Sequence, residues 1–211
     1  MDVAMVDKLR REWQEKELHF HMRTNKHIQR VQNNIISLFS PSSGDYYDML
    51  SIVEAYGLDK DELFSELRDH DSSKFKEPQF KAYVEISWSY YQTLDLKKPY
   101  PLNQVMQSNA TIHHIITEKH HPEYWDPTFL TGNKFNVTNR DGIPDTPVDA
   151  VMMPLTWIAV MTCDWIAVAQ ERNTNAGDWA NMTINKRWLF TGEQEQLIWH
   201  IIQYFGMLPN V

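Results

Sequence analysis

The chain has 211 residues, of which 42% are hydrophobic, and a formal net charge of −8. This length can bury one sizeable core, so we expect a single domain over residues 1–211. The negative charge disfavours a surface that tracks extended nucleic acid, although a local basic pocket for one nucleotide stays open, and no apolar stretch is long enough to span a bilayer.

The number of cysteines further limits the kinds of structural and metal site that the chain can form. Cys163 is the only cysteine, so neither a disulfide framework nor a thiolate metal site is available. The segment 1–20 carries charges throughout and has no apolar run typical of a secretory signal. We therefore expect a cytoplasmic protein with no membrane partner.

Hydrophobic residues recur at helical spacing along most of the chain, and no segment shows the alternation typical of a strand. The pattern predicts an all-α fold, a single helical domain of about seven helices with one long loop. In chain order, the first two helices are expected over 3–39 and 44–55. The third is opened by a capping box of Asp59 and Glu62 and ends with His70 and Asp71, and the fourth has Pro78 in its first turn. Two more helices are expected over 103–121 and 148–172, and a last one is capped by Thr191 and ends at Gly206. The long loop is the segment 122–147, which is rich in Pro, Gly, Asn and Asp, and loops of this length often form a lid or binding rim.

Histidine and aspartate residues occur in several of these helices in positions that suit a metal site. Neutral imidazoles and carboxylates are the usual ligands of catalytic metals, and such a site draws them from separate segments. His114 and His121 are two turns apart on the expected fifth helix, so both should project from one face. A carboxylate at Asp164, in an apolar helix, needs a cation or a donor. The metal-competent residues of these segments are His27, His70, Asp71, His113, His114, His120, His121 and Asp164.

Simpler interpretations exist for each residue alone. A single histidine among these is more often a hydrogen-bonded core or surface residue than a ligand. Asp164 could pair with Lys74 or Arg23, and the tryptophans at 88, 157 and 165 suit a core. Only the presence of metal-competent residues in several separate segments favours a metal site.

The order of these residues resembles the HD-domain superfamily of all-α, metal-dependent phosphohydrolases, and especially its dinuclear branch. The resemblance rests on this order: His27, the run RDHDSSKF that holds His70 and Asp71, His114, the run KHHPEYWD that holds His120 and His121, and Asp164. The chain departs from that branch in a shorter spacing from His114 to His120 and in lacking the glycine-rich part of the GYP motif. More locally, HDSSKF and HHPEYW resemble a small uncharacterised family of bacterial and bacteriophage proteins.

The resemblance implies a site and a chemistry. His27, His70, Asp71 and Asp164 would hold a first divalent transition metal, Mn, Fe, Co, Ni or Zn, and His114 with His120 or His121 would hold a second. Asp71 would bridge the ions, and Lys74 would stabilise phosphoryl charge or protonate the leaving group. The implied reaction is hydrolysis of a nucleotide or similar small phosphoester.

The sequence also offers candidate residues for substrate contacts and leaves other functions open. Candidate phosphate anchors are Arg23 and Lys26, with Lys186 and Arg187 weaker, and solvated surface cations are the alternative for all four. The loop aromatics are expected either to rim the site or to pin the loop to the core; they are Tyr124, Trp125, Phe129 and Phe135. Two other functions remain open, an HD-type di-iron oxygenase and a non-catalytic metal- or nucleotide-binding protein. Substrate identity and oligomeric state are left open.

Overall fold

The computed structural model describes residues 3–41, 50–136 and 141–209. These form two compact units, each built from two stretches of chain. Unit 1 comprises Met1–Lys26 and Asp71–His114, and unit 2 comprises His27–His70 and Ile115–Val211. We describe each unit by itself, and the expectation of a single domain stays a prediction.

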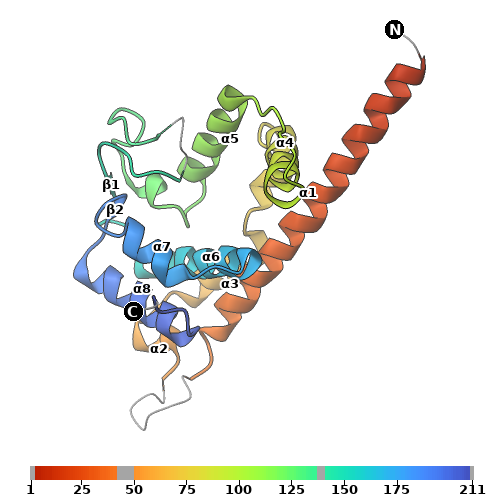
Figure 1. Cartoon of the computed structure of the whole chain (residues 1–211). Helices are drawn as coiled ribbons and strands as arrows, with labels where there is room; N and C mark the ends of the chain where they lie inside the picture. Colours follow the sequence, from red (N-terminus) through yellow and green to blue (C-terminus); the bar gives the residue numbers. More distant parts are fainter. Residues whose placement is uncertain (1–2, 42–49, 137–140, 210–211) are drawn as a thin grey trace. The chain divides into compact units, whose positions relative to one another are not determined.

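The predicted all-α class is confirmed. The described residues contain eight α-helices, two-residue strands β1 and β2, and short 3-10 and π turns (Figure 1). None of these helices has the length and apolar character needed to cross a membrane. The helices are α1 (Val3–Ser37), α2 (Ile52–Ala55), α3 (Lys60–Asp69), α4 (Phe80–Tyr90), α5 (Gln104–Thr117), α6 (Leu155–Arg172), α7 (Ala176–Thr183) and α8 (Gly192–Tyr204).

Helix α6 is the centre of unit 2. Every residue in 156–163 is buried, so this stretch has no solvent face, and α3, α7 and α8 pack against the helix (Figure 1). A helix that is apolar on all sides is stable only when it is enclosed in this way. The fully buried side chains of the unit include Ile35, Leu38, Leu63, Ile158, Met161, Ile166, Leu197, Ile198, Ile201 and Ile202.

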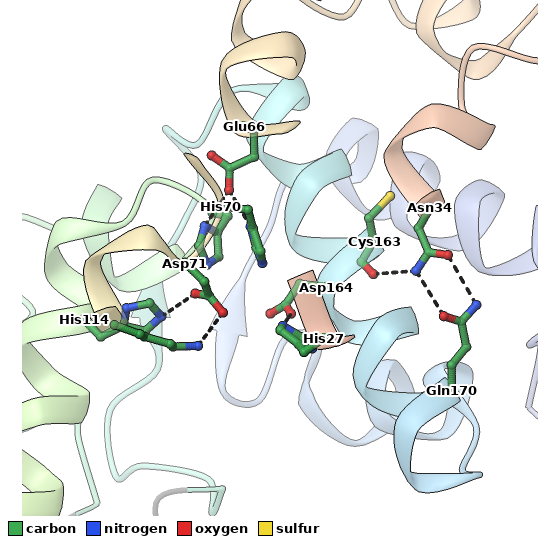
Figure 2. A network of polar contacts seen from close by, with 11 residues as sticks. His27, Asn34, Glu66, His70, Asp71, His114, Cys163, Asp164 and Gln170 are labelled. Atoms are coloured by element: carbon green, nitrogen blue, oxygen red, sulfur yellow. Dashed lines mark hydrogen bonds and ion pairs between the residues drawn. The ribbon is translucent and has the colours of Figure 1, made fainter. Parts of the chain in front are cut away.

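The C-terminal half of α1 is bound to α6 by polar contacts as well as by packing. Asn34 Nδ2 donates a hydrogen bond to the Cys163 carbonyl at 3.0 Å and lies 3.5 Å from the Gln170 Oε1 (Figure 2). Val31 lies on the same helix and is fully buried. Because His27 is one turn before Val31 on α1, these contacts hold His27 against the middle of α6.

The segment before α6 differs from the prediction. A helix was expected from residue 148, but Val148–Asp149 is strand β1, which pairs in parallel with β2 (Trp188–Leu189). Gln194 explains the irregular residues that follow, because its side-chain amide donates to the carbonyls of Ala150 at 3.1 Å and Met153 at 2.7 Å. These carbonyls are satisfied from α8 and need no helix of their own.

Unit 1 has a smaller core around α4. Ala82, Ile86 and Ala110 are buried together, and Tyr83, Tyr90, Leu102 and Met106 pack against them. Helix α1 adds Phe20, whose ring lies 5.3 Å from the Phe75 ring and 5.7 Å from the Phe80 ring. The part of α1 before Lys16 is largely exposed.

Several helix ends were predicted wrongly. Helix α5 stops at Thr117, and His121 is extended because the residue before a proline is excluded from the helical region, here by Pro122. Helix α3 stops at Asp69, so His70 and Asp71 lie outside it. Helix α4 begins at Phe80 rather than around Pro78.

The two short helices α7 and α2 can also be compared with the prediction. Helix α7 was not expected at all, and Asn175 caps its first turn by accepting from the Gly177 amide. Helix α2 has a capping box formed by Ser51 and Glu54, and the first part of the helix expected over 44–55 lies outside the described residues. The capping box predicted for α8 is confirmed at Thr191 and Gln194.

Candidate metal centre

His70 and Asp71, the His-Asp pair, follow directly after the end of α3. Asp59 caps the start of the helix by accepting from the amides of Asp61 and Glu62, and His70 follows the last helical residue. Asp71 then takes a left-handed backbone conformation with φ 58°. Non-glycine residues adopt this conformation rarely, and where they do, the strain often belongs to a functional site.

Glu66 contacts two histidines of unit 2. His70 Nδ1 lies 2.6 Å from Glu66 Oε1, and His120 Nδ1 lies 3.0 Å from the same oxygen. All three residues are buried. Burial by itself raises the pKa of Glu66, but the hydrogen bonds and charges of His120 and His70 outweigh it and lower that pKa to about 2. Glu66 is therefore ionised at neutral pH.

A second contact joins α1 to α6 within unit 2. His27 Nε2 lies 2.9 Å from Asp164 Oδ1, and the two side chains are 12% and 18% exposed (Figure 2). Burial alone raises the pKa of Asp164, but the hydrogen bond from His27 and the charges of His27, His70 and His120 hold it well below the usual range. Within unit 2, His27 thus supplies the partner that a carboxylate in these apolar surroundings requires.

These contacts form one continuous group of imidazoles and carboxylates. The His27 and His70 rings have centroids 5.8 Å apart, and the His70 and His120 rings 4.5 Å apart. Glu66, His70 and His120 each offer a ligand atom within 4.8 Å of the others, and His27 and His70 meet the same criterion as a pair. Unit 2 therefore contains a cluster that could bind a metal ion.

The sequence interpretation missed Glu66. The signal was present, because Glu66 lies four residues before His70 in the helix predicted there, and residues at this spacing share one helix face. The interpretation also placed His114 and His121 on one helix face, which is wrong, since α5 ends between them. His120 and His121 instead lie in the turn that precedes the 3-10 helix Pro122–Trp125, with ring centroids 4.5 Å apart.

Unit 1 contains a polar group of its own. Lys74 Nζ donates to Asp71 Oδ2 at 2.5 Å. His114 Nε2 lies 3.2 Å from Asp71 Oδ1 (Figure 2). Lys74 also lies 5.3 Å from the centroid of the Tyr83 ring. His113 points elsewhere, because its Nδ1 lies 2.9 Å from the Gln79 amide nitrogen. The lysine expected to act in catalysis is thus already bound to the aspartate of the His-Asp pair.

The predicted phosphate anchors have different environments. Lys26 is exposed, and Arg23 lies over the Tyr90 ring at 5.9 Å. Lys186 is exposed and donates to the Asn181 carbonyl. Arg187 is half-buried: it donates to the Gly142 carbonyl at 3.3 Å, lies 3.9 Å from Glu123 Oε1 and lies over the Trp188 ring.

The loop aromatics make contacts of their own. Trp125 Nε1 donates to the Lys119 carbonyl at 2.9 Å, and the Tyr124 ring packs edge-on against Trp125. Phe129 is buried and packs against Phe135. These contacts pin the loop to its own surroundings, and a role of Trp125 in substrate binding stays a prediction.

Fold and site together define the class of this protein: it is an all-α protein with a buried histidine and carboxylate cluster suited to a metal ion. The chain belongs to a family of unknown function, DUF5662, whose model matches residues 16–204. No curated protein and no solved structure matches it.

Proposed function

We propose that this protein is a metal-dependent phosphohydrolase that acts on a nucleotide or a similar small phosphoester. The observation that carries the proposal is the convergence in unit 2 of His27, His70, His120 and Asp164, which come from four separate segments. Their order along the chain resembles that of the HD-domain phosphohydrolases, and this supports the reaction class. The single cysteine supports a reducing, cytoplasmic location.

The residues present fit a divalent metal. Asp164 is a partly buried, ionised carboxylate, and His27 and His70 are imidazoles whose nitrogens lie near it. A set of imidazole and carboxylate ligands without thiolate suits Mn, Fe, Co, Ni or Zn, as one or two ions. When bound, such an ion supplies Lewis acidity that makes water nucleophilic near neutral pH.

The chain's own groups would prepare the site for that chemistry. Asp164 would hold His27 in place through their 2.9 Å contact, and the burial of His70 and His120 keeps bulk water away. In unit 1, Lys74 is bound to Asp71 at 2.5 Å, and the resemblance to the HD-domain phosphohydrolases assigns this lysine to charge stabilisation on phosphoryl oxygens.

The test combines elemental analysis with a screen for phosphate release. Purified wild type, Asp164→Asn and the control Asp178→Asn are compared; Asp178 is an exposed aspartate on α7 of the same unit. Circular dichroism establishes that each variant is folded. Nucleotide mono- and triphosphates, cyclic nucleotides and aryl phosphates are supplied with Mn, Co, Fe, Ni or Mg.

We expect wild type and Asp178→Asn to contain metal and release phosphate, and Asp164→Asn to lose both. Activity that survives Asp164→Asn would overturn the proposal. Iron with oxygen consumption and no phosphate release would replace it with an oxygenase, and bound metal without any turnover would replace it with a binding protein.

A further inference from the structure

Glu66 differs from the other carboxylates of the cluster in that two imidazoles meet at one of its oxygens. His70 reaches Oε1 from the end of α3, and His120 reaches it from the turn after α5. The side chains of Glu66, His70 and His120 are 9%, 0% and 1% exposed, so water does not replace either contact. A buried carboxylate is costly unless its partners repay that cost, and here both partners are histidines.

The chemistry of the 2.6 Å contact determines which nitrogen of the His70 ring carries the proton. An ionised carboxylate can only accept hydrogen bonds, so His70 Nδ1 must be the donor. A neutral imidazole has one N–H, and its other nitrogen then presents a lone pair. In His70 that nitrogen is Nε2, which a metal can bind.

The same contact sets the direction of the other nitrogen of the His70 ring. The His70 and His120 rings have centroids 4.5 Å apart and an interplanar angle of 38°. Because His70 Nδ1 makes its hydrogen bond with Glu66 Oε1, Nε2 on the other side of that ring faces away from Glu66. His27 offers a ring nitrogen within 4.8 Å of a ligand atom of His70.

We infer that Glu66 is a positioning residue that holds His70 with Nδ1 protonated, so that His70 binds metal through Nε2. The inference rests on the proposed metal site. A carboxylate behind a metal-binding imidazole also raises its basicity, and loss of such a partner costs about 10- to 100-fold in metal affinity.

The first measurement uses the wild-type protein without metal. Long-range proton–nitrogen NMR spectra of the histidine rings, recorded after chelation at about pH 8, report which nitrogen is protonated. We expect Nδ1–H in His70, and loss of this preference in Glu66→Met, which keeps the length of the side chain without its acceptor. Nε2–H in the His70 ring of wild type would overturn the inference, whether or not any variant folds.

The second measurement is titration with Zn²⁺ and Co²⁺. Glu66→Gln should raise the dissociation constant by about 10- to 100-fold, whereas the control Glu62→Gln should stay within about twofold of wild type. Glu62 is on the same helix, one turn earlier, and its side chain pairs with Lys119 instead.

The two proposals fail in different ways. If Glu66 has no positioning role, wild type still binds metal tightly and Glu66→Gln binds it equally well. If the metal site itself is wrong, wild type and Asp164→Asn both bind negligible metal, although the NMR result for the metal-free rings still holds. If only the hydrolase reaction is wrong, metal affinities follow the expected order without phosphate release.

Discussion

Stability of the metal-free protein should depend on pH through Glu66, because its pKa is lowered from an ordinary value of 4.5 to about 2. A group whose pKa is depressed on folding contributes stability above its unfolded pKa and loses it as the pH falls toward the folded value. The interval of about 2.5 pH units corresponds to about 3 kcal/mol of unfolding free energy, at about 1.4 kcal/mol per unit. Because the side chain is only 9% exposed, solvent screening is small.

Glu66→Gln tests this reasoning, since glutamine resembles the protonated carboxyl in shape and charge. Relative to wild type, the variant should lose about 3 kcal/mol at pH 6, and the difference should fall to about 1.4 kcal/mol at pH 3. Urea unfolding with a chelator present, followed by tryptophan fluorescence at several pH values, measures both free energies. The control Glu62→Gln removes an equal charge from the same helix and should show no comparable change.

Two results would refute the linkage. One is a Glu66→Gln deficit that is the same at pH 3 and pH 6, which would mean that the cost comes from packing rather than from ionisation. The other is a variant as stable as wild type at pH 6, which would mean that the two histidines do not stabilise the charged form of Glu66.

Three further predictions concern activity and packing. Lys74→Met should lower phosphate release by about 100-fold or more while metal stays bound, because Lys74 supplies charge rather than a ligand; unchanged turnover contradicts this. Trp125→Ala should raise Michaelis constants without changing metal content, and constants equal to wild type for every substrate would assign Trp125 to pinning the loop. Ile201→Ala should lower the free energy of unfolding by about 2–5 kcal/mol, since this side chain of α8 is fully buried, and a loss below about 1 kcal/mol in urea unfolding would contradict the packing described here.

Local signals in the sequence account for most of the helices. The long apolar periodicity of α1 predicted nearly its whole length, and the capping box at Thr191 predicted the start of α8, because caps and periodicity depend on residues within a turn or two. The end of α5 was also encoded locally, in the restriction that Pro122 places on His121, but the periodicity beyond Thr117 outweighed it in the prediction.

Other elements depend on distant partners. Strand β1 exists because β2, about 40 residues later, supplies its hydrogen bonds, and the bend before α6 exists because Gln194 satisfies its carbonyls. Neither partner is visible in the local pattern, where residues 148–154 read as the first turns of a helix. Helix α7 was missed because eight residues give little periodicity to detect.

For the candidate site too, some features could be predicted from the sequence and others depend on the tertiary structure. Residue types and order alone identified His27, His70, His120 and Asp164 as metal-competent, since few side chains have suitable donor atoms. Tertiary structure alone brought His27 to Asp164, which is 137 residues away in the chain, and enclosed Glu66 with two imidazoles. A charged residue on a helix has the same local sequence whether it faces water or the core, so only the packing of α3 determined that Glu66 is buried and bonded rather than solvated.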